Sequence, residues 1–417
     1  MKIALITPHL TYPPVIGYDL RIWQLARTLS QASDGDLEVL LLEERYEEKR
    51  RVPLEGRIKW IPLPLVFRYG RAILGRRSPI LLRLISGIAL LPLLINLNWL
   101  EYIIILITKR GCPKVLEVIK EMKPDIVVLV NYLYLAGFVP LIRELGIRVV
   151  VDLQNVESQV AQDLNREVRS WKSYVLWKIR ERFARCLEQR FLALSDELWA
   201  PSLEDAQRIE KITKAISVKV VPNAVDLERY KNNFREKANT ICFVGYYTYP
   251  PNLKAAHLLI EQIYPIVKRY EPSATLYLVG RNPSPYMLKV ACQEKKIIVT
   301  GEVKDALCYI SQASVIVVPL LSGGGTRFKI VEAMALGKAI VSTPKGCEGI
   351  EVQDGVHLLI REIEEFPEAI LTLFRQPDLR KALGYRAREL VKEKYSWLAA
   401  AKIIKERLTH LTKMEFC

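Results

Sequence analysis

The chain has 417 residues, half of them hydrophobic, which is enough for two domains with separate cores and excludes an intrinsically disordered protein. Its formal net charge of +15 and its pI of about 9.4 predict attraction to an anionic partner: nucleic acid, acidic lipid or a phosphorylated substrate. Nucleic acid is the least supported of the three, because the sequence has no zinc-finger, RNP or basic-zipper pattern.

The first half of the chain alternates apolar segments with amphipathic ones. An amphipathic helix is expected at 19–30 and a long basic helix at about 171–194. Strands are expected at 2–7, 37–43, 125–130, 148–153, 197–202 and 218–223. Continuous apolar strands separated by helices are typical of a parallel sheet that is covered on both faces. We therefore expect residues 1–222 to form one doubly wound α/β domain.

The same alternation begins again after residues 223–240, a polar, irregular segment that we interpret as a linker. Further strands are expected at 240–245, 275–280, 296–301, 315–321 and 339–343. Helices are expected at about 253–269, near Tyr286, at 305–312 and at 397–411. The pattern predicts a second doubly wound domain. Ligands of such sheets bind at the carboxyl ends of the strands, so we expect an active site in a cleft between the two domains.

Residues 65–110 do not fit this alternation. They contain 17 successive residues without a charge, LISGIALLPLLINLNWL, with arginines before the run and Lys109 and Arg110 after it. A membrane-spanning helix needs about 20 apolar residues, and this run is interrupted by Pro92 and two asparagines. We favour a pair of short helices in a membrane interface, with arginines at anionic head groups. A buried helical pair and a true span are the alternatives.

The basic, aromatic-rich helix at 171–190 also admits two interpretations. It either faces a membrane or an anionic acceptor, or packs as a connecting helix with exposed arginines. The packed helix is the interpretation that we favour.

The stretch 323–343, GGGTRFKIVEAMALGKAIVST, is the most informative part of the chain. Its glycines follow an apolar run and precede a helical pattern and a second strand, which together make one βαβ unit. In such a unit the loop amides and the helix N-terminus form a positive cradle for phosphate. Glu332, about two turns into the expected helix, would then meet a ribose hydroxyl of the same ligand. The stretch predicts a site for a nucleotide diphosphate, although a glycine run alone also fits a plain turn.

Seven cysteines are dispersed along the chain without a C-x-x-C pair, which indicates reduced thiols and a reducing compartment. The apolar run at 2–7 is short and is followed by Pro8, so we interpret it as a strand and not as a signal peptide. We therefore expect a cytoplasmic protein.

Several of these segments resemble the retaining glycosyltransferases of family 4, which have the GT-B fold. The resemblance extends along nearly the whole chain and is most specific at 319–350, because GGGTR-x-K-x-x-EAMA-x-G is typical of one branch of that family. The other matching segments are 1–29, 220–230 (VVPNAVDLERY), 243–256 (FVGYYTYPPNLKAA), 276–283 (LYLVGRNP) and 299–305 (VTGEVKD).

The resemblance implies a GT-B protein with two Rossmann-like domains that face a cleft. Residues 1–222 would bind the acceptor, and 241–396 would bind a nucleotide-diphosphate sugar. A C-terminal helix at 397–417 would return to the N-terminal domain. The implied reaction is transfer of a sugar with retention at the anomeric carbon. No metal is expected, because the sequence has no D-x-D motif at an obvious strand end and the helix dipole with basic side chains would replace a cation.

The resemblance also implies roles for individual residues. Glu332 would accept hydrogen bonds from the ribose, while Arg327 and Lys329 would neutralise the leaving diphosphate and so accelerate the reaction. Gly17 would give a close backbone approach from the first domain, and Val303 would bind the base through its backbone. The expected donor-binding residues are Gly17, Gly245, Arg281, Val303, Gly323, Gly324, Gly325, Thr326 and Glu332.

Two departures from the family pattern concern the donor site. Gly324 stands where many members have the first of two glutamates. Tyr246 and Tyr247 follow the first strand of the second domain, where an Arg/Lys pair is often found. Neutralisation of the diphosphate would then fall to Arg327, Lys329, Arg281 or Lys254.

The third departure is Gln154, which occupies the place of a histidine that is usual in the family. Glutamine can donate a hydrogen bond to a sugar hydroxyl but cannot act as a general base. Retaining enzymes of this fold are thought to use the leaving phosphate as the proton acceptor, so we keep Gln154 among the catalytic residues with Glu332, Arg327 and Lys329. Glu157 and His9 are weaker candidates, since each fits an ordinary structural position.

The sequence thus predicts a cytoplasmic glycosyltransferase, peripheral on the inner face of the cell membrane. Its acceptor would be a lipid-linked or membrane-associated glycan, as in polysaccharide or cell-envelope synthesis, and residues 65–110 would contact an anionic membrane surface. The alternatives are a non-catalytic member of the same fold that binds nucleotide or glycan, a sugar-nucleotide epimerase, and a transferase with a soluble acceptor.

Overall fold

The computed structural model describes residues 1–7, 17–43, 57–62, 113–130, 135–166, 170–214, 218–231, 235–324 and 327–413. The chain divides into two compact units, the first comprising Met1–Pro222 with Ala401–Cys417 and the second Asn223–Ala400. The segment predicted at 65–110, His9, Gly325 and Thr326 lie outside the described residues.

The first unit is built on a parallel sheet. Seven strands of the described residues pair in the order β3-β2-β1-β4-β5-β6-β7. They are β1 (Ile3–Thr7), β2 (Leu37–Glu43), β3 (Arg57–Pro62), β4 (Ile126–Val130), β5 (Arg148–Asp152), β6 (Glu197–Ala200) and β7 (Val218–Val220). The order proceeds outward from β1 on one side and from β4 on the other, so the sheet is doubly wound with its switch point between these two strands.

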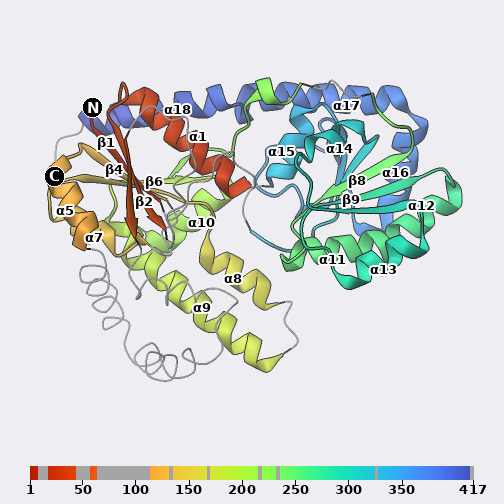
Figure 1. Ribbon diagram of the computed structural model, residues 1–417, viewed down its shortest axis with the longest axis horizontal. Helices are drawn as coiled ribbons and strands as arrows, with labels where there is room; N and C mark the ends of the chain where they lie inside the picture. The colour runs from red at the N-terminus through yellow and green to blue at the C-terminus, as the bar shows by residue number, and fades with distance from the viewer. Residues whose placement is uncertain are drawn as a thin grey trace. The chain divides into compact units, whose positions relative to one another are not determined.

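Helices cover both faces of this sheet (Figure 1). They are α1 (Gly17–Ala32), α5 (Pro113–Met122), α7 (Phe138–Arg143), α8 (Glu157–Asn165), α9 (Trp171–Arg190), α10 (Leu203–Thr213) and the short η1 (Leu192–Leu194). Alternate residues of β1 belong to different cores: Ile3 and Leu5 pack with α1, whereas Ala4 and Ile6 pack with α5 and α7. This alternation explains why β1 is apolar throughout, because a strand that is covered on both faces has no solvent side.

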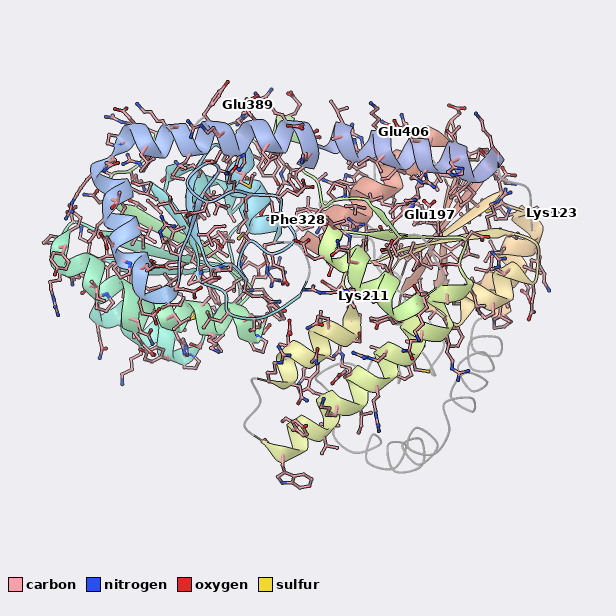
Figure 2. The ribbon with its side chains drawn as sticks, turned by 180° about the vertical axis from the view of Figure 1, so that it is seen from behind. Lys123, Glu197, Lys211, Phe328, Glu389 and Glu406 are labelled. Carbon is pink, nitrogen blue, oxygen red and sulfur yellow. The ribbon has the colours of Figure 1, made fainter. Side chains whose placement is uncertain are left out.

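The C-terminal helix α18 (Trp397–Lys413) begins in the second unit and ends in the first. Ile404, Leu408 and Leu411 pack into the same core as α1. Arg407 of α18 binds the carboxylate of Glu197 in β6, a residue that is labelled in Figure 2. The helix is therefore fixed to the N-terminal sheet by an apolar face and by one ion pair.

The second unit repeats the same plan with a six-stranded parallel sheet in the order β10-β9-β8-β11-β12-β13. Its strands are β8 (Thr240–Val244), β9 (Thr275–Val279), β10 (Ile297–Gly301), β11 (Val315–Val318), β12 (Ala339–Ser342) and β13 (Leu359–Ile360). Its helices are α11 (Pro250–Leu258), α12 (Tyr264–Tyr270), α13 (Pro285–Gln293), α14 (Leu307–Gln312), α15 (Phe328–Ala335), α16 (Phe366–Arg375) and α17 (Pro377–Leu390), and its short turns are η2 (Leu227–Arg229), η3 (Leu259–Ile263), η4 (Ile363–Glu365) and η5 (Val391–Tyr395). The switch point of this sheet lies between β8 and β11.

The predicted fold of two doubly wound α/β units is confirmed, with local corrections. The described part of the expected linker, 223–240, belongs to the second unit, where Val225 pairs with Ser396 and Tyr230 is buried. Its polar composition hid these two apolar anchors. The single helix expected at 253–269 is divided by the π-helical turn η3, because Pro265 lacks the backbone N–H that a continuous α-helix would use.

No helix among the described residues combines the length and the apolar character that crossing a membrane requires.

Candidate functional site

The candidate site lies at the switch point of the second sheet, where the loops after β8 and β11 leave neighbouring strands in different directions. Lys329 of α15 joins the two loops, because its Nζ donates a hydrogen bond to Oδ1 of Asn252 in α11 at 2.8 Å. Asn252 in turn donates to the carbonyl of Tyr246, which follows β8, at 3.1 Å. Segments 77 residues apart in sequence are thereby held together at the place where doubly wound sheets bind ligands.

Glycines make the close approach of these loops possible. Gly323 has a φ of +103°, and a Cβ atom there would lie 2.7 Å from the hydroxyl of Tyr249. Gly280, at the end of β9, has a φ of +137°, and a Cβ atom there would lie 1.9 Å from the carbonyl oxygen of Gly245. Any other residue at Gly280 would force the backbone after β8 to move. Gly245 directly follows β8, Gly323 lies in the loop after β11, and Gly280, which the sequence analysis did not single out, directly follows β9.

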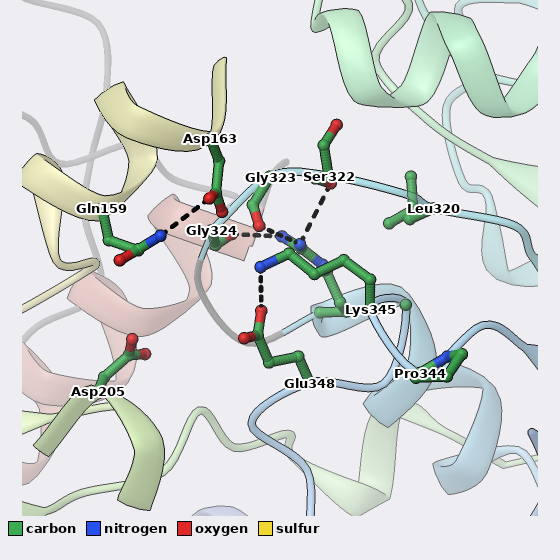
Figure 3. Close-up of polar contacts among 12 residues, drawn as sticks. Gln159, Asp163, Asp205, Leu320, Ser322, Gly323, Gly324, Pro344, Lys345 and Glu348 are labelled. Carbon is green, nitrogen blue, oxygen red and sulfur yellow. Dashed lines mark hydrogen bonds and ion pairs between the residues drawn. The ribbon is translucent and has the colours of Figure 1, made fainter. Parts of the chain in front are cut away.

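Arg327 is buried and bound within its own loop. Its guanidinium donates hydrogen bonds to the carbonyl oxygens of Gly324, of Gly323 at 2.7 Å and of Ser322 at 3.5 Å. Dashed lines mark these bonds at the labelled residues Ser322, Gly323 and Gly324 in Figure 3. These carbonyls are turned inward by the guanidinium. Arg327 therefore shapes the glycine loop, and its charge contributes to the positive potential at the start of α15.

Lys329 is half-buried, with its ammonium 4.5 Å from the centre of the Phe243 ring. Burial and the neighbouring charge of Arg327 lower the pKa of Lys329 to about 7, against a smaller opposing effect of Glu332. The group is thus a cation that lacks a full counter-charge in the protein. An anion bound beside it would restore the ordinary protonation of the lysine.

Glu332 is the fifth residue of α15, a little more than one turn from its start, which corrects the two turns expected. Its Oε1 accepts a hydrogen bond from the hydroxyl of Tyr230 at 2.9 Å. Burial raises the pKa of the Glu332 carboxyl, and the Tyr230 hydrogen bond opposes that rise. The same surroundings raise the pKa of Tyr230, so the tyrosine stays a hydrogen-bond donor.

The helix α15 itself begins at Phe328, with Arg327 as its N-cap residue. Gly325 and Thr326, which we expected at the helix N-terminus, therefore precede it and lie outside the described residues.

Other expected donor-binding residues lie near the carboxyl ends of strands farther from the switch point. Arg281 follows β9 and forms an ion pair with Glu302 at 2.8 Å, with both side chains substantially exposed. Val303 follows the edge strand β10 and packs partly against the core. Lys254, on α11, is exposed. Lys329, by contrast, bridges the segments that follow β8 and β11 through its hydrogen bond to Asn252.

In the first unit, Gln154 lies just after β5 and donates a hydrogen bond to Oδ2 of Asp152 at 3.1 Å. Arg21 of α1 binds the same carboxylate through two hydrogen bonds of 2.9 and 2.5 Å, and donates a third to the carbonyl of Val221 at 2.8 Å. Gly17 is the first residue of α1. The buried Arg21–Asp152 pair therefore fixes α1 and the position of Gln154 together at the carboxyl end of the sheet.

Glu157, one of the weaker candidates, begins α8 and lies 3.5 Å from Arg180 of α9. Burial raises the pKa of its carboxyl, and Arg180 opposes the rise. This ion pair joins two helices of the first unit, which is the structural position that we considered the simpler explanation.

Sequence reasoning missed Asn252 and Tyr230 as site residues. Both lie within segments that had been noticed for their family resemblance, 243–256 and 220–230. Their roles depend on contacts with Glu332 and Lys329 of α15, and the local sequence around Asn252 and Tyr230 does not predict contacts with a segment so distant in the chain.

Two family models match the chain. Residues 238–376 match a model described as "Glycosyl transferases group 1", and residues 91–229 match one described as "Glycosyltransferase Family 4". These matches support a GT-B glycosyltransferase. The first match contains the glycine loop, Lys329 and Glu332. The second contains Gln154 and ends one residue before Tyr230.

An uncharacterised glycosyltransferase of Methanocaldococcus jannaschii is 24% identical to the chain over 204 residues. The alignment covers 47% of this chain and 51% of that relative, so the chain spans about half the length of the curated relative that it matches.

Solved structures share the fold along nearly the whole chain. Sucrose-phosphate synthase from Thermosynechococcus elongatus has a TM-score of 0.69 at 16% identity, with 98% of each chain covered. HepE of Anabaena in complex with UDP-glucose has a TM-score of 0.65 at 15% identity, with 98% of this chain and 100% of that chain covered. At such identities the likeness shows the fold, and the predicted GT-B fold is confirmed.

Proposed function

We propose that the chain is a retaining glycosyltransferase that uses a nucleotide-diphosphate sugar as its donor. The observation that supports this most strongly is the bridge from Lys329 to Asn252 at the switch point of the second sheet. It places a cation without a full counter-charge beside a glycine loop, with a carboxylate one turn farther along the same helix. This combination fits a ligand that has both a diphosphate and a ribose.

Each group has a distinct task in this proposal. Lys329 neutralises the diphosphate as it leaves, which is where charge develops in a sugar transfer. Glu332 accepts a hydrogen bond from a ribose hydroxyl, with Tyr230 keeping the carboxylate oriented. The backbone amides of the glycine loop add hydrogen-bond donors, and Arg327 holds that loop in shape. We propose that these groups supply the positive charge without a metal ion.

Retention is proposed on the family resemblance and agrees with the chemistry of Gln154. Its amide donates to Asp152 and cannot remove a proton from an acceptor hydroxyl. The departing phosphate is then the available proton acceptor. A general base on the first unit is not required for this reaction.

We further propose a uridine diphosphate sugar as the donor and a lipid-linked or membrane-associated glycan as the acceptor. The donor rests on HepE, a structure of the same fold solved with UDP-glucose. The acceptor rests on the basic charge of the chain and on the apolar, arginine-flanked composition of 65–110. In this proposal the protein works at the inner face of the cell membrane, in the synthesis of a polysaccharide or an envelope glycan.

Thermal stabilisation by nucleotides tests the donor site. UDP, GDP, ADP and dTDP, and their sugars, are compared on the native chain and on Glu332→Ala. At 100 times the dissociation constant, one-site binding should add about 2.7 kcal/mol of stability. Stabilisation by one nucleotide that Glu332→Ala removes would support the proposal. Glu364→Ala, which changes an exposed glutamate of η4 in the same unit, is the matched control and should keep the full response.

A non-catalytic member of the fold is the second candidate, favoured by Gln154 and by Gly324 in place of a carboxylate. It would bind the same nucleotide but would not release sugar from the nucleotide sugar. Measuring that release with the sugar that stabilises the protein best separates the two functions. A sugar-nucleotide epimerase would instead convert the sugar while it remains attached to the nucleotide.

A further inference from the structure

The N-terminal half of α9 has a surface that the proposed transfer reaction does not use. The C-terminal half of this helix packs into the core of the first unit through Ala184 and Leu187, and Cys186 beside them is also buried. Among the described side chains from Trp171 to Phe183, by contrast, none is buried. The packed connecting helix that the sequence favoured is therefore buried in its second half, whereas its first half contacts α8 through Arg180 and leaves several apolar side chains exposed.

Large apolar side chains are exposed in the first two turns of α9. The exposed fractions are 72% for Trp171, 50% for Tyr174, 45% for Val175 and 63% for Leu176. Trp171, Tyr174 and Val175 lie on one face of the helix, and exposed apolar side chains that cluster in this way mark interaction sites.

Helical spacing places the apolar end in line with basic residues. Trp171, Tyr174 and Val175 share one face with Lys178, Arg182 and Arg185, since successive members are one, three or four residues apart. We call these six residues the α9 stripe. Arg182 and Arg185 are exposed, and Lys178 forms an ion pair with Glu181 at 3.0 Å. The stripe is thus aromatic at one end and cationic along the rest.

We propose that the α9 stripe docks the protein on an anionic lipid surface. Tryptophan and tyrosine favour the boundary between head groups and acyl chains, where one end of the ring is apolar and the other is wet. Arginine and lysine on the same helix face then meet anionic head groups. The net charge of +15 favours the same partner and opposes a second copy of this chain, which would bring an equal positive charge.

The residues of the α9 stripe are not part of the segment 65–110 for which a membrane contact is expected, and the inference does not depend on the proposed sugar transfer. If the acceptor is lipid-linked, docking through α9 brings the first unit to the surface that contains it.

Co-sedimentation of the full chain with vesicles tests the proposal. The vesicles are equal mixtures of phosphatidylglycerol and phosphatidylcholine, compared with phosphatidylcholine alone, at physiological ionic strength. The first variant, Trp171→Ser with Tyr174→Ser, removes the aromatic end of the stripe. The second, Arg182→Glu with Arg185→Glu, reverses its cationic part. The matched control, Lys402→Glu with Lys405→Glu, makes the same charge change at exposed positions of α18 in the same unit.

The native chain should bind the anionic vesicles and bind phosphatidylcholine weakly. Each stripe variant should lower the partition coefficient at least about tenfold, and the control should change it no more than about twofold. All substituted residues are on the surface, and unchanged thermal midpoints verify folding. Binding that both stripe variants retain, or that the control loses equally, would overturn the proposal. So would self-association that depends on the stripe without vesicle binding, which would assign the surface to a second copy.

Discussion

Replacing Lys329 by methionine should stabilise the protein in the absence of nucleotide while it weakens nucleotide binding. The pKa of Lys329 falls from 10.5 to about 7 on folding, chiefly through burial. Each pKa unit corresponds to about 1.4 kcal/mol, so the charged lysine costs at most about 5 kcal/mol below pH 7. Methionine keeps the apolar stem but loses the hydrogen bond to Asn252 and the contact with Phe243, which contribute about 1 kcal/mol each. Solvent also screens part of the cost at this half-buried position, and we expect a net gain of about 2 kcal/mol at pH 6.5.

The pH dependence of this difference is the sharper test. Because the folded-state pKa of Lys329 is depressed, the unfolded chain binds more protons between pH 7 and 10.5. Stability of the native chain therefore rises with pH across that window, by up to about 1.4 kcal/mol per unit from this group. The methionine variant lacks that rise, so its advantage of about 2 kcal/mol should shrink above pH 7, vanish near about pH 8.5 and reverse by about pH 10.

Urea denaturation followed by circular dichroism at pH 6.5, 8 and 9.5 measures the difference. Lys289→Met, which removes an exposed lysine of α13 in the same unit, is the control and should show little effect. If the free energies of unfolding of Lys329→Met and of the native chain differ by the same amount at every pH, the reasoning is refuted. It is also refuted if the variant is less stable than the native chain at pH 6.5.

The same lysine predicts how nucleotide binding depends on pH. A diphosphate beside Lys329 should restore its proton, so the affinity for nucleotide should fall above pH 7, at most about tenfold per unit. Glu332 must be ionised to accept a ribose hydroxyl, and its pKa is raised by burial, so the affinity should also fall at acid pH. Calorimetry in two buffers of different ionisation enthalpy should show proton uptake at pH 8. An affinity that is flat from pH 7 to 9 would contradict the assignment of Lys329.

Two further substitutions test the close backbone contact at Gly280 in the second unit and the Arg21–Asp152 ion pair in the first. Gly280→Ala should destabilise the protein by more than about 2 kcal/mol in thermal or urea unfolding, because its Cβ would overlap the carbonyl of Gly245 as well as strain a φ of +137°. Gly355→Ala, where φ is also positive but no atom lies within 4 Å, should cost clearly less, and equal costs would exclude the overlap. Arg21→Met should cost about 3–5 kcal/mol because it leaves the buried carboxylate of Asp152 without its cation, and adding Asp152→Asn should restore most of the loss. A double variant as unstable as the single one would show that the guanidinium matters through its other contacts.

The main strands of both units could be predicted from the sequence because each is an uninterrupted apolar run. These strands are covered on both faces, so β4 and β11 are apolar throughout, and β5 and β8 are apolar except at polar end residues. The edge strands β3 and β13 were missed. β3 contains Arg57 and Lys59, and β13 has two residues, so neither has an apolar run to recognise.

The position of the glycine loop could also be predicted from the sequence, because the loop needs a positive φ at Gly323 and glycine is the residue that adopts it without strain. The charge state of the site could not be predicted from the sequence. Lys329 and Glu332 resemble any helix cation and anion in sequence, and their altered pKa values arise only when neighbouring segments bury them.

Local sequence thus determined which segments are strands, where the glycine loop lies and which family the chain resembles. Only the tertiary structure decided which side chains contact one another. Tyr230 and Glu332 are 102 residues apart, and Arg21 and Asp152 are 131 residues apart. Strand order and the crossing of helices over the sheet set these pairs, and hydrophobic periodicity specifies which face of an element is buried but not which distant element covers it.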